Sequence, residues 1–271
     1  MSRESSRESR RRAIEQARQG EARRKRRMRL AAWGGAIVVV AGAGIGIGIG
    51  VSGGGNGGAS AASGSGTTAS GTAGTSAAGY LPLPTLGTLT AAPAPGALGP
   101  ENVPIPSVPA LAGTAAAVTG KTVDGISCET SEQTVFHIHT HLTVFVNGQQ
   151  RQVPAAIGIP GGVAQQSATG PSIASGTCFY FLHTHAADGI IHIESPAQRT
   201  YTLGEFFDEW GQPLGPDQAG TARGKVTVIV NGEVFKGNPR NAPLGSHENL
   251  QLEVGTPLVA PETINWSNTG L

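Results

Sequence analysis

The segment from Val135 to Val146 alternates polar and apolar side chains with a period of two residues. His137, His139 and His141 fall on one side of an extended strand with this period. The opposite side is apolar and consists of Phe136, Ile138, Leu142, Val144 and Val146. The two exceptions to the pattern are Thr140 and Phe145. The sequence therefore predicts a strand that buries one face and presents a row of imidazoles on the other.

A second stretch, from Cys178 to Glu194, carries three more histidines, which are His183, His185 and His192. We predict a hairpin here because Gly189 can take positive φ in the turn. A four-residue loop at 186–189 would place His183 opposite His192. A two-residue loop at Asp188 and Gly189 would place His185 there instead. Either register keeps the three histidines and Glu194 on one face.

Neutral imidazole is a ligand for zinc, copper, nickel and iron, and cross-strand Cβ atoms lie about 4.5–5.5 Å apart, so neighbouring strands can share one ion. We therefore predict a Zn(II) or Cu(II) site with the ligands His137, His139, His141, His183, His185 and His192. Six histidines could also hold two ions. Glu194 or Asp188 is a candidate fourth ligand or general base. Of the two, Glu194 is our candidate catalytic residue. Both methionines, Met1 and Met28, precede the histidines, which argues against methionine-ligated copper.

A near-repeat shows that this kind of strand does not require histidine. The segments Thr143–Gly148 and Thr227–Gly232 read TVFVNG and TVIVNG, and each Asn-Gly pair predicts a tight hairpin turn. When the two turns are aligned, the first three histidines correspond to Thr221, Arg223 and Lys225. A polar strand face alone could explain two alternating histidines, but the full set points to a chemical role. The lone His247 is predicted to be a surface residue.

The remaining pattern predicts an α+β fold, in which a mainly antiparallel β-sheet packs against one principal helix at about 202–211. Thr202 and Glu205 form a capping box at the start of this helix. Its apolar face consists of Leu203, Phe206, Phe207 and Trp210, and Gly211 and Pro213 follow its end. Further strands are expected at Gln152–Ile159 and Leu250–Val254.

Cys128 and Cys178 are the only cysteines, and each precedes a histidine segment. Outside the cytoplasm such a pair predicts a disulfide, with thiolate metal ligation as the alternative. A disulfide would tie together the two segments that carry the histidines.

The charge distribution predicts a membrane-anchored protein. Residues 1–29 carry twelve Lys/Arg and four Asp/Glu, whereas the rest carries seven and fourteen. The 22 uncharged residues 30–51 are long enough to cross a bilayer, so we predict a single-pass helix with a cytoplasmic N-terminus and an extracytoplasmic C-terminal domain. Spaced glycines could also support helix–helix association, and they are Gly42, Gly46 and Gly50.

A cleaved signal peptide is the rival interpretation, because Ala59-Ser60-Ala61 has the form of a cleavage site and Arg26-Arg27 precedes the apolar run. Nucleic-acid binding by the basic segment is not expected, since a topology signal explains the same charges. Residues 52–117 are rich in Gly, Ser and Ala and then in Pro, which predicts a disordered linker. The folded domain would then span residues 118–271.

The two histidine segments resemble a group of secreted or membrane-anchored microbial proteins with HxHxH and HTHxxxGxIHIE motifs. The resemblance covers roughly residues 130–255 and implies a domain that folds as a unit, but it implies no activity.

The leading hypothesis is a membrane-anchored extracytoplasmic metal-binding domain. A metal-dependent hydrolase or hydratase is the first alternative, which leaves enzymatic activity open. The second alternative is a cell-envelope interaction module whose histidines respond to pH near 6.5.

Overall fold

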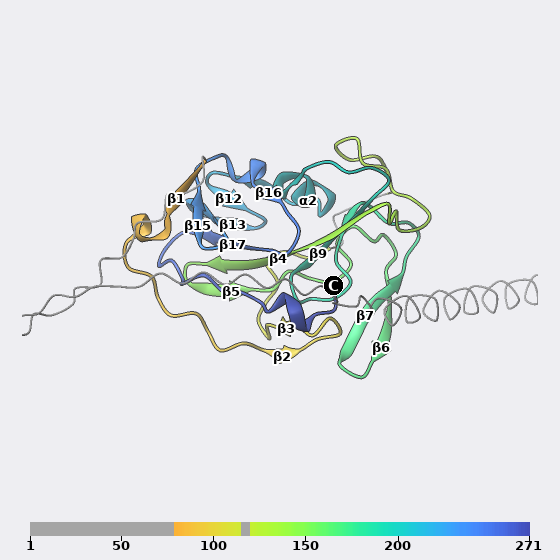
Figure 1. The fold of residues 1–271 in the computed structure, drawn as a ribbon, viewed down its shortest axis with the longest axis horizontal. Coiled ribbons are helices and arrows are strands. Elements are labelled where there is room, and N and C mark those ends of the chain that lie inside the picture. The colour runs from red at the N-terminus through yellow and green to blue at the C-terminus, as the bar shows by residue number, and fades with distance from the viewer. Residues whose placement is uncertain (1–78, 115–119) are drawn as a thin grey trace, which may run out of the picture. The chain divides into compact units, whose positions relative to one another are not determined.

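The central sheet of this computed structural model, which describes residues 79–114 and 120–271, is built around the predicted histidine strand (Figure 1). Its strands lie side by side in the order β1 (Tyr80–Pro82), β15 (Glu233–Phe235), β14 (Val226–Val230), β17 (Glu248–Val254), β4 (Phe136–Val146), β9 (Ile190–Ser195) and β8 (Leu182–His183), and β5 (Gln149–Arg151) pairs with β4. The pairing of β17 with β4 is parallel, and the other pairs in the sheet are antiparallel. The sheet is therefore mainly antiparallel, as predicted.

Short elements surround this sheet. The additional strand pairs and the three-stranded unit are β2 (Ala97–Leu98) with β3 (Pro104–Ile105), β6 (Val163–Ser167) with β7 (Gly170–Ser175), β10 (Tyr201–Thr202) with β16 (Pro243–Leu244), and β11 (Leu214–Gly215), β12 (Gln218–Ala219) and β13 (Ala222–Arg223). The helical elements are α2 (Leu203–Glu209) and the 3₁₀ turns η1 (Leu83–Leu86), η2 (Pro239–Asn241) and η3 (Trp266–Asn268).

Both predicted Asn-Gly hairpins are present. Asn147 and Gly148 have φ of 49° and 74° and join β4 to β5, while Asn231 and Gly232 have φ of 49° and 83° and join β14 to β15. Positive φ at both central residues matches the twist of a tight hairpin. Strand β17 lies between the two repeated segments and pairs with both.

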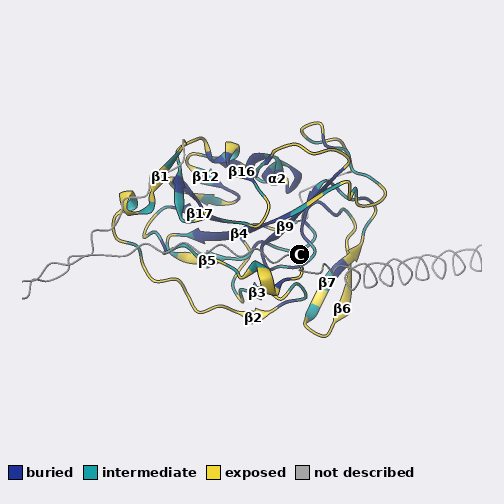
Figure 2. Cartoon of the chain, in the orientation of Figure 1, coloured by how far each residue is buried: buried dark blue, intermediate teal, exposed yellow. Residues whose placement is uncertain are grey.

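Helix α2 confirms the predicted helix in position and capping. Thr202 accepts a hydrogen bond from the backbone N–H of Glu205, whose side chain accepts one from the backbone of Thr202. The predicted apolar face is fully buried and consists of Leu203, Phe206, Phe207 and Trp210. These side chains share one core with the apolar face of the sheet, including Leu142, Val144, Ile191, Ile193, Leu250 and Leu252 (Figure 2).

Glu209, at the end of α2, is fully buried against strand β8. One carboxylate oxygen accepts a hydrogen bond from the backbone N–H of Leu182 at 3.2 Å, and the other has no partner. Burial raises the pKa of Glu209 well above its ordinary value of 4.5. The folded protein therefore keeps this carboxyl protonated at a pH where the unfolded chain ionises it.

We expect Glu209→Gln to stabilise the protein at pH 7.5 by about 1–3 kcal/mol, because an amide avoids the cost of the buried carboxyl. Because folding raises the pKa of Glu209, its protonation contributes to the free energy of unfolding. This contribution is fully present below pH 4.5, the ordinary pKa, and falls as the pH rises towards the pKa in the folded protein. Urea unfolding of both proteins at pH 4 and pH 7.5 measures this. An equal difference at the two pH values would contradict the assignment.

The second face of the sheet is covered by an extended C-terminal segment. Buried Gln251 and Glu253 of β17 lie on this face, the same face as the histidines of β4. Gln251 donates to the carbonyl of Val259 at 3.0 Å and accepts from the N–H of Glu262 at 2.9 Å, while Glu253 accepts from the N–H of Val259 at 3.0 Å. These side chains therefore hold the segment across the sheet, and the histidine end of the face remains open.

The predicted linker boundary was wrong over its proline-rich part. Residues 79–114, named the N-terminal arm below, pack on the domain: β1 pairs with the edge strand β15, Val103 and Leu111 are buried, and the indole N–H of Trp210 donates to the carbonyl of Gly113 at 3.0 Å. Proline prevents helix formation but allows extended chain at a sheet edge. The arm therefore gains backbone hydrogen bonds from the edge of a sheet that the rest of the domain forms.

Residues 1–78, which include the predicted basic segment, membrane span and Gly-rich linker, lie outside the described residues. Within residues 79–114 and 120–271, no helix is both long and apolar enough to span a bilayer.

Candidate metal centre

Strands β4, β9 and β8 bring the predicted histidines to one face. In the β4–β9 register, His139 lies opposite His192 and His137 opposite Glu194. In the β9–β8 register, His192 lies opposite His183, which is the register of the four-residue loop. Gly189 has a φ of 84°, as the predicted turn requires. The apolar residues that alternate with these histidines point to the opposite face, where Leu182, Ile191 and Ile193 lie in the core.

The disulfide between Cys128 and Cys178 is present, as predicted. Directly after it, Glu129 and Phe179 exchange two backbone hydrogen bonds of 2.9 and 2.8 Å. The cross-link therefore fixes the chain that leads into strand β8 and His183. A disulfide is typical of a domain outside the cytoplasm.

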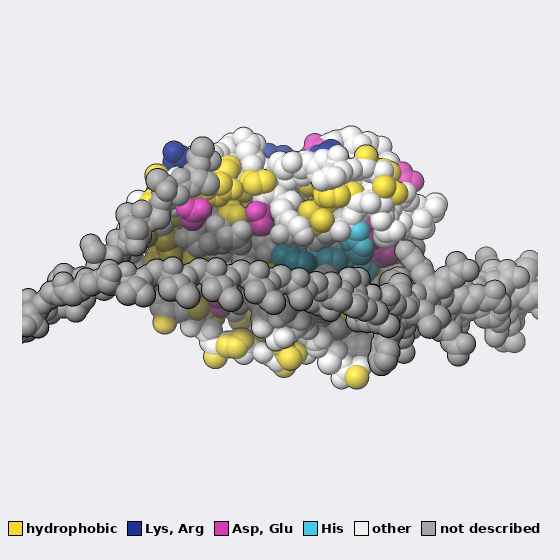
Figure 3. Space-filling model, in the orientation of Figure 1, with side chains coloured by type: hydrophobic (Ala, Val, Ile, Leu, Met, Phe, Trp, Pro, Cys, Tyr) yellow, Lys and Arg dark blue, Asp and Glu magenta, His cyan; other side chains and the backbone are white. Residues whose placement is uncertain are grey.

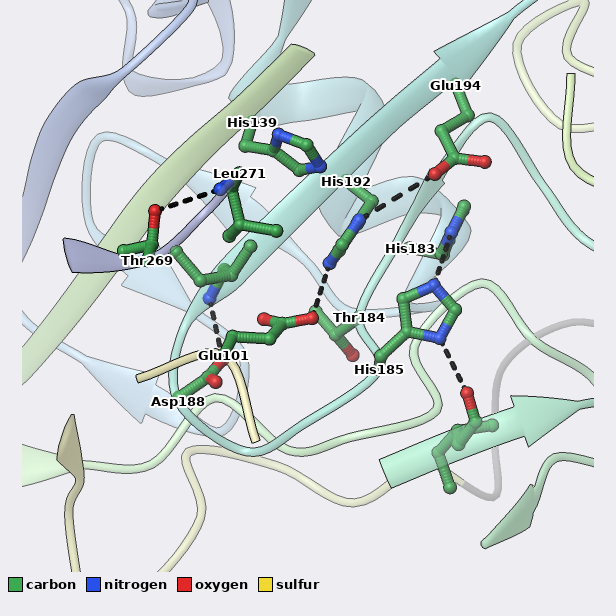
Figure 4. Close-up of polar contacts among 12 residues, drawn as sticks. Glu101, His139, His183, Thr184, His185, Asp188, His192, Glu194, Thr269 and Leu271 are labelled. Carbon is green, nitrogen blue, oxygen red and sulfur yellow. Dashed lines mark hydrogen bonds and ion pairs between the residues drawn. The ribbon is translucent and has the colours of Figure 1, made fainter. Parts of the chain in front are cut away.

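His183 and His185 form a pair whose ring orientation is fixed by the backbone (Figure 4). The Nδ1 atom of His183 lies 2.9 Å from the carbonyl of Tyr180, and that of His185 lies 2.6 Å from the carbonyl of Ile173. A carbonyl can only accept, so each Nδ1 carries the proton and each neutral ring has a lone pair on Nε2. The two Nε2 atoms face each other at 3.2 Å. Two lone pairs cannot form a hydrogen bond, whereas a cation between them would satisfy both.

His137 and His139 form a second pair on strand β4. Their Nε2 atoms are 3.0 Å apart, and the Nε2 of His137 is also 3.0 Å from a carboxylate oxygen of Glu194. Nitrogen ligands of one tetrahedral zinc ion, at bonds of about 2.0–2.1 Å, lie about 3.3 Å apart. Both histidine pairs therefore have separations close to those of ligands on a metal.

His192 lies between the two pairs and contacts two carboxylates. Its Nε2 lies 2.8 Å from Glu101, and its Nδ1 lies 3.7 Å from Glu194. Burial would lower the pKa of His192, but the hydrogen bond with Glu101 and the close negative charges of Glu101 and Glu194 outweigh burial and raise it to about 9. A pKa of about 9 gives the His192 side chain a positive charge at pH 7, in the middle of the cluster.

The other buried histidines are neutral at pH 7. Burial, followed by the charge on His192, lowers the pKa of His139 to about 3 and that of His183 well below its ordinary value. The same two causes lower the pKa of His185. Neutral imidazoles are the form that binds metal, so these side chains would not have to lose a proton to bind an ion.

His141 is on the predicted strand face but stands apart from the cluster. Its Nε2 lies 3.0 Å from the carbonyl of Asp188, and it lines a separate cavity of about 220 Å³ with prolines of the N-terminal arm. Burial lowers the pKa of His141 to about 4. Asp188, the other candidate carboxylate, accepts from the N–H of Ile190 at 3.1 Å, and burial followed by the charge of Glu101 raises its pKa to about 7.

Two sets of potential ligand atoms lie within 4.8 Å of one another in the described residues: the first is His183, His185, His192 and Glu194, and the second is His137, His139 and His192. The chemistry of these donors fits Zn(II) or Cu(II). Among the described residues, eight buried side-chain atoms lack a hydrogen-bond partner, and those in this cluster are Nδ1 of His192, Oε2 of Glu194 and Oε2 of Glu101. Such unsatisfied atoms are costly unless a ligand occupies the site.

The cluster opens into a hollow of about 500 Å³, so an ion bound there would be accessible. The hollow is lined by His137, His139, His185, His192 and Glu194 and, on its far side, by Ser246, His247, Gly270 and Leu271. Figure 3 shows histidine side chains on this face. His247 is exposed and stacks on Trp266 with ring centroids 4.8 Å apart, which confirms it as a surface residue.

Two carboxylates of the centre were missed from the sequence. Glu101 lies in the turn between β2 and β3 of the N-terminal arm, in a segment expected to be disordered. Glu132 lies 3.4 Å from the Nε2 of His185 and follows the disulfide in a loop without regular structure. Neither residue lies in a segment with a periodic pattern of polar and apolar side chains. Only the negative charge of each, in a chain with few acidic residues, could have indicated a role.

No protein-family model, curated protein or solved structure matches the chain. Function is therefore inferred from the geometry of the centre.

Proposed function

We propose that this domain binds Zn(II) or Cu(II) through His183, His185, His192 and Glu194. The facing Nε2 lone pairs of His183 and His185, fixed by carbonyl groups at Nδ1, are the observation that carries the proposal. Backbone or carboxylate acceptors at the distal nitrogen are the usual support for metal-binding histidines. His192 and Glu194 complete a set of nitrogen and oxygen donors suited to either ion.

Elemental analysis of the full-length protein, purified from the membrane fraction of cells that export it, tests this proposal. We expect zinc or copper to co-purify and to return to the protein after chelation. In zinc titrations of the metal-free protein, His183→Ala/His185→Ala should weaken binding by more than about 100-fold, because it removes two ligands rather than a supporting contact. His247→Ala, which changes an exposed histidine on the same hollow, is the matched control. Equal binding by all three proteins would exclude this site.

A metal-dependent hydrolase or hydratase is the second candidate, and the open hollow beside Glu194 favours it. An ion held there could activate water if one coordination position stays free. The variant Glu194→Gln distinguishes a metal ligand from a general base at this position. The metal-loaded variant is assayed for hydrolysis of 4-nitrophenyl acetate. Loss of turnover with metal retained identifies a general base, and absence of turnover in the unmodified protein counts against hydrolase activity.

We also propose that residues 30–51 anchor the domain to the cell membrane as a single-pass helix, with the domain on the extracytoplasmic side. The basic segment before this apolar run and the disulfide support the orientation. Release of the full-length protein from membranes by alkaline carbonate would count against an anchor.

A further inference from the structure

We infer, on the basis of the proposed metal function, that the centre holds two metal ions: a second ion bound by His137 and His139, with His192 and Glu194 lying between the two. The site would then be dinuclear, with a divalent zinc or copper ion at each histidine pair.

The order of three neighbouring strands produces this arrangement. Strand β4 contributes the pair His137 and His139, and the chain at and after β8 contributes the pair His183 and His185. Strand β9 lies between them and contributes His192 and Glu194, which are two residues apart and face the same side. Figure 4 shows His192 between His139 and the pair formed by His183 and His185.

One ion cannot be bound by both pairs. Atoms bound to the same zinc ion at about 2.0–2.1 Å are at most about 4.2 Å apart. The two sets of ligand atoms that lie within 4.8 Å of one another share His192, but neither contains members of both pairs. The ring centroids of His192 lie 4.6 Å from those of His139 and 4.5 Å from those of His185, so His192 is equally near the two pairs.

The residues in the middle have enough donor atoms for two neighbours. The carboxylate of Glu194 has two oxygens, so it can contact an ion on either side, whereas His192 offers only Nδ1, because its Nε2 is in contact with Glu101 at 2.8 Å. Nδ1 of His192 and Oε2 of Glu194 are buried and have no hydrogen-bond partner. Oε1 of Glu194 lies 3.0 Å from His137 of the second pair, while Glu194 also belongs to the ligand set of the first pair.

The surrounding carboxylates provide charge for a second dication. Glu101, Glu132 and Glu194 each lie within 3.4 Å of a histidine of the cluster. Ionised, they carry three negative charges, whereas a single divalent ion carries two positive charges. One dication with three carboxylates leaves a net charge of −1 and two leave +1, so the carboxylates can compensate a second ion as well as a first in a hollow open to solvent.

Metal stoichiometry of the full-length protein tests the inference. Metal-free protein is dialysed against Zn(II) and bound zinc is measured per chain. We expect two equivalents for the unmodified protein and for the control His247→Ala, and one equivalent for His137→Ala/His139→Ala and for His183→Ala/His185→Ala. His137→Ala alone serves as a milder variant, because this side chain is 41% exposed and its removal leaves the core intact.

Copper gives an independent readout. With two Cu(II) ions bound at adjacent sites, spin coupling should broaden or abolish the ordinary mononuclear electron paramagnetic resonance signal, and either pair variant should restore it at one ion per chain. One equivalent in the unmodified protein with an uncoupled signal overturns the dinuclear inference and leaves the proposed function standing. Binding that none of the variants alters overturns both.

Discussion

Each bound zinc ion is expected to raise the free energy of unfolding by about 4 kcal/mol when the free zinc concentration is about 1,000 times the dissociation constant, because an ion that binds only the folded state stabilises it by mass action. The ligands come from β4, β9 and the chain around β8, so the unfolded chain does not hold them in this geometry. Urea unfolding at pH 7.5, with buffered zinc or with chelator, measures the difference.

Two variants test where zinc acts in this prediction. His183→Ala/His185→Ala should lose the part of the gain that comes from an ion bound at this pair, whereas His247→Ala should keep the whole gain. An equal gain in all three proteins would show that zinc acts elsewhere on the molecule, and a loss of stability on adding zinc would show that it prefers the unfolded chain.

Replacement of both cysteines, as Cys128→Ala/Cys178→Ala, is expected to lower the free energy of unfolding by about 4 kcal/mol. The bridge spans 50 residues, and opening it returns conformational freedom to a loop that contains strand β4 and the β6–β7 hairpin. Unfolding of the oxidised protein and of the variant, both with chelator present, isolates this effect from metal binding. A change below about 1 kcal/mol would mean that the unfolded chain keeps the loop compact without the bridge.

The cysteine variant should also bind zinc more weakly. The disulfide lies directly before the Glu129–Phe179 backbone pairing that leads to His183, so its loss loosens one of the two histidine pairs. Zinc titration of the folded variant, compared with the oxidised unmodified protein, checks this consequence.

Features determined by neighbouring residues were predictable from the sequence. The two-residue period placed His137 and His139 on one face of β4, and the capping box of Thr202 and Glu205 located α2. The Asn-Gly turns located both hairpins because few residues adopt positive φ at low cost. Each of these signals is local, so no knowledge of the tertiary structure was needed.

Features determined by distant residues were not predictable in this way. The apolar pattern of β17 indicated a strand, but nothing in it specified parallel pairing with β4. The predicted strand at 152–159 does not form beyond its first residue: Pro154 lacks an N–H, and Ala156 and Gly158 have φ of 68° and 69°. That segment turns instead, and the backbone of Ile157 pairs with Thr184, between the two histidines of the pair.

The N-terminal arm shows the same limit for the site itself. Its composition predicts disorder when the segment is considered alone, because it cannot bury enough apolar surface. The folded domain provides the missing partners, including Gln152, which donates to the carbonyl of Pro106 at 2.8 Å. Glu101 reaches His192 only because the arm is docked in this way. The sequence of the arm alone could therefore not assign Glu101 to the centre, because the arm becomes ordered only through contacts with the rest of the fold.

The parallel pairing of β4 with β17 also has a kinetic consequence. Thr140 pairs with Glu248, a separation of 248 − 140 = 108 residues, so the contact order of the central sheet is high. Such topologies fold slowly, because a long loop must close before its contacts form. During synthesis, strand β4 emerges long before β17 and exposes imidazoles that are not yet held in position. Metal ions that bind an unfolded chain compete with its folding, so under the proposed metal function the order of folding and metal loading should determine the yield of the folded centre.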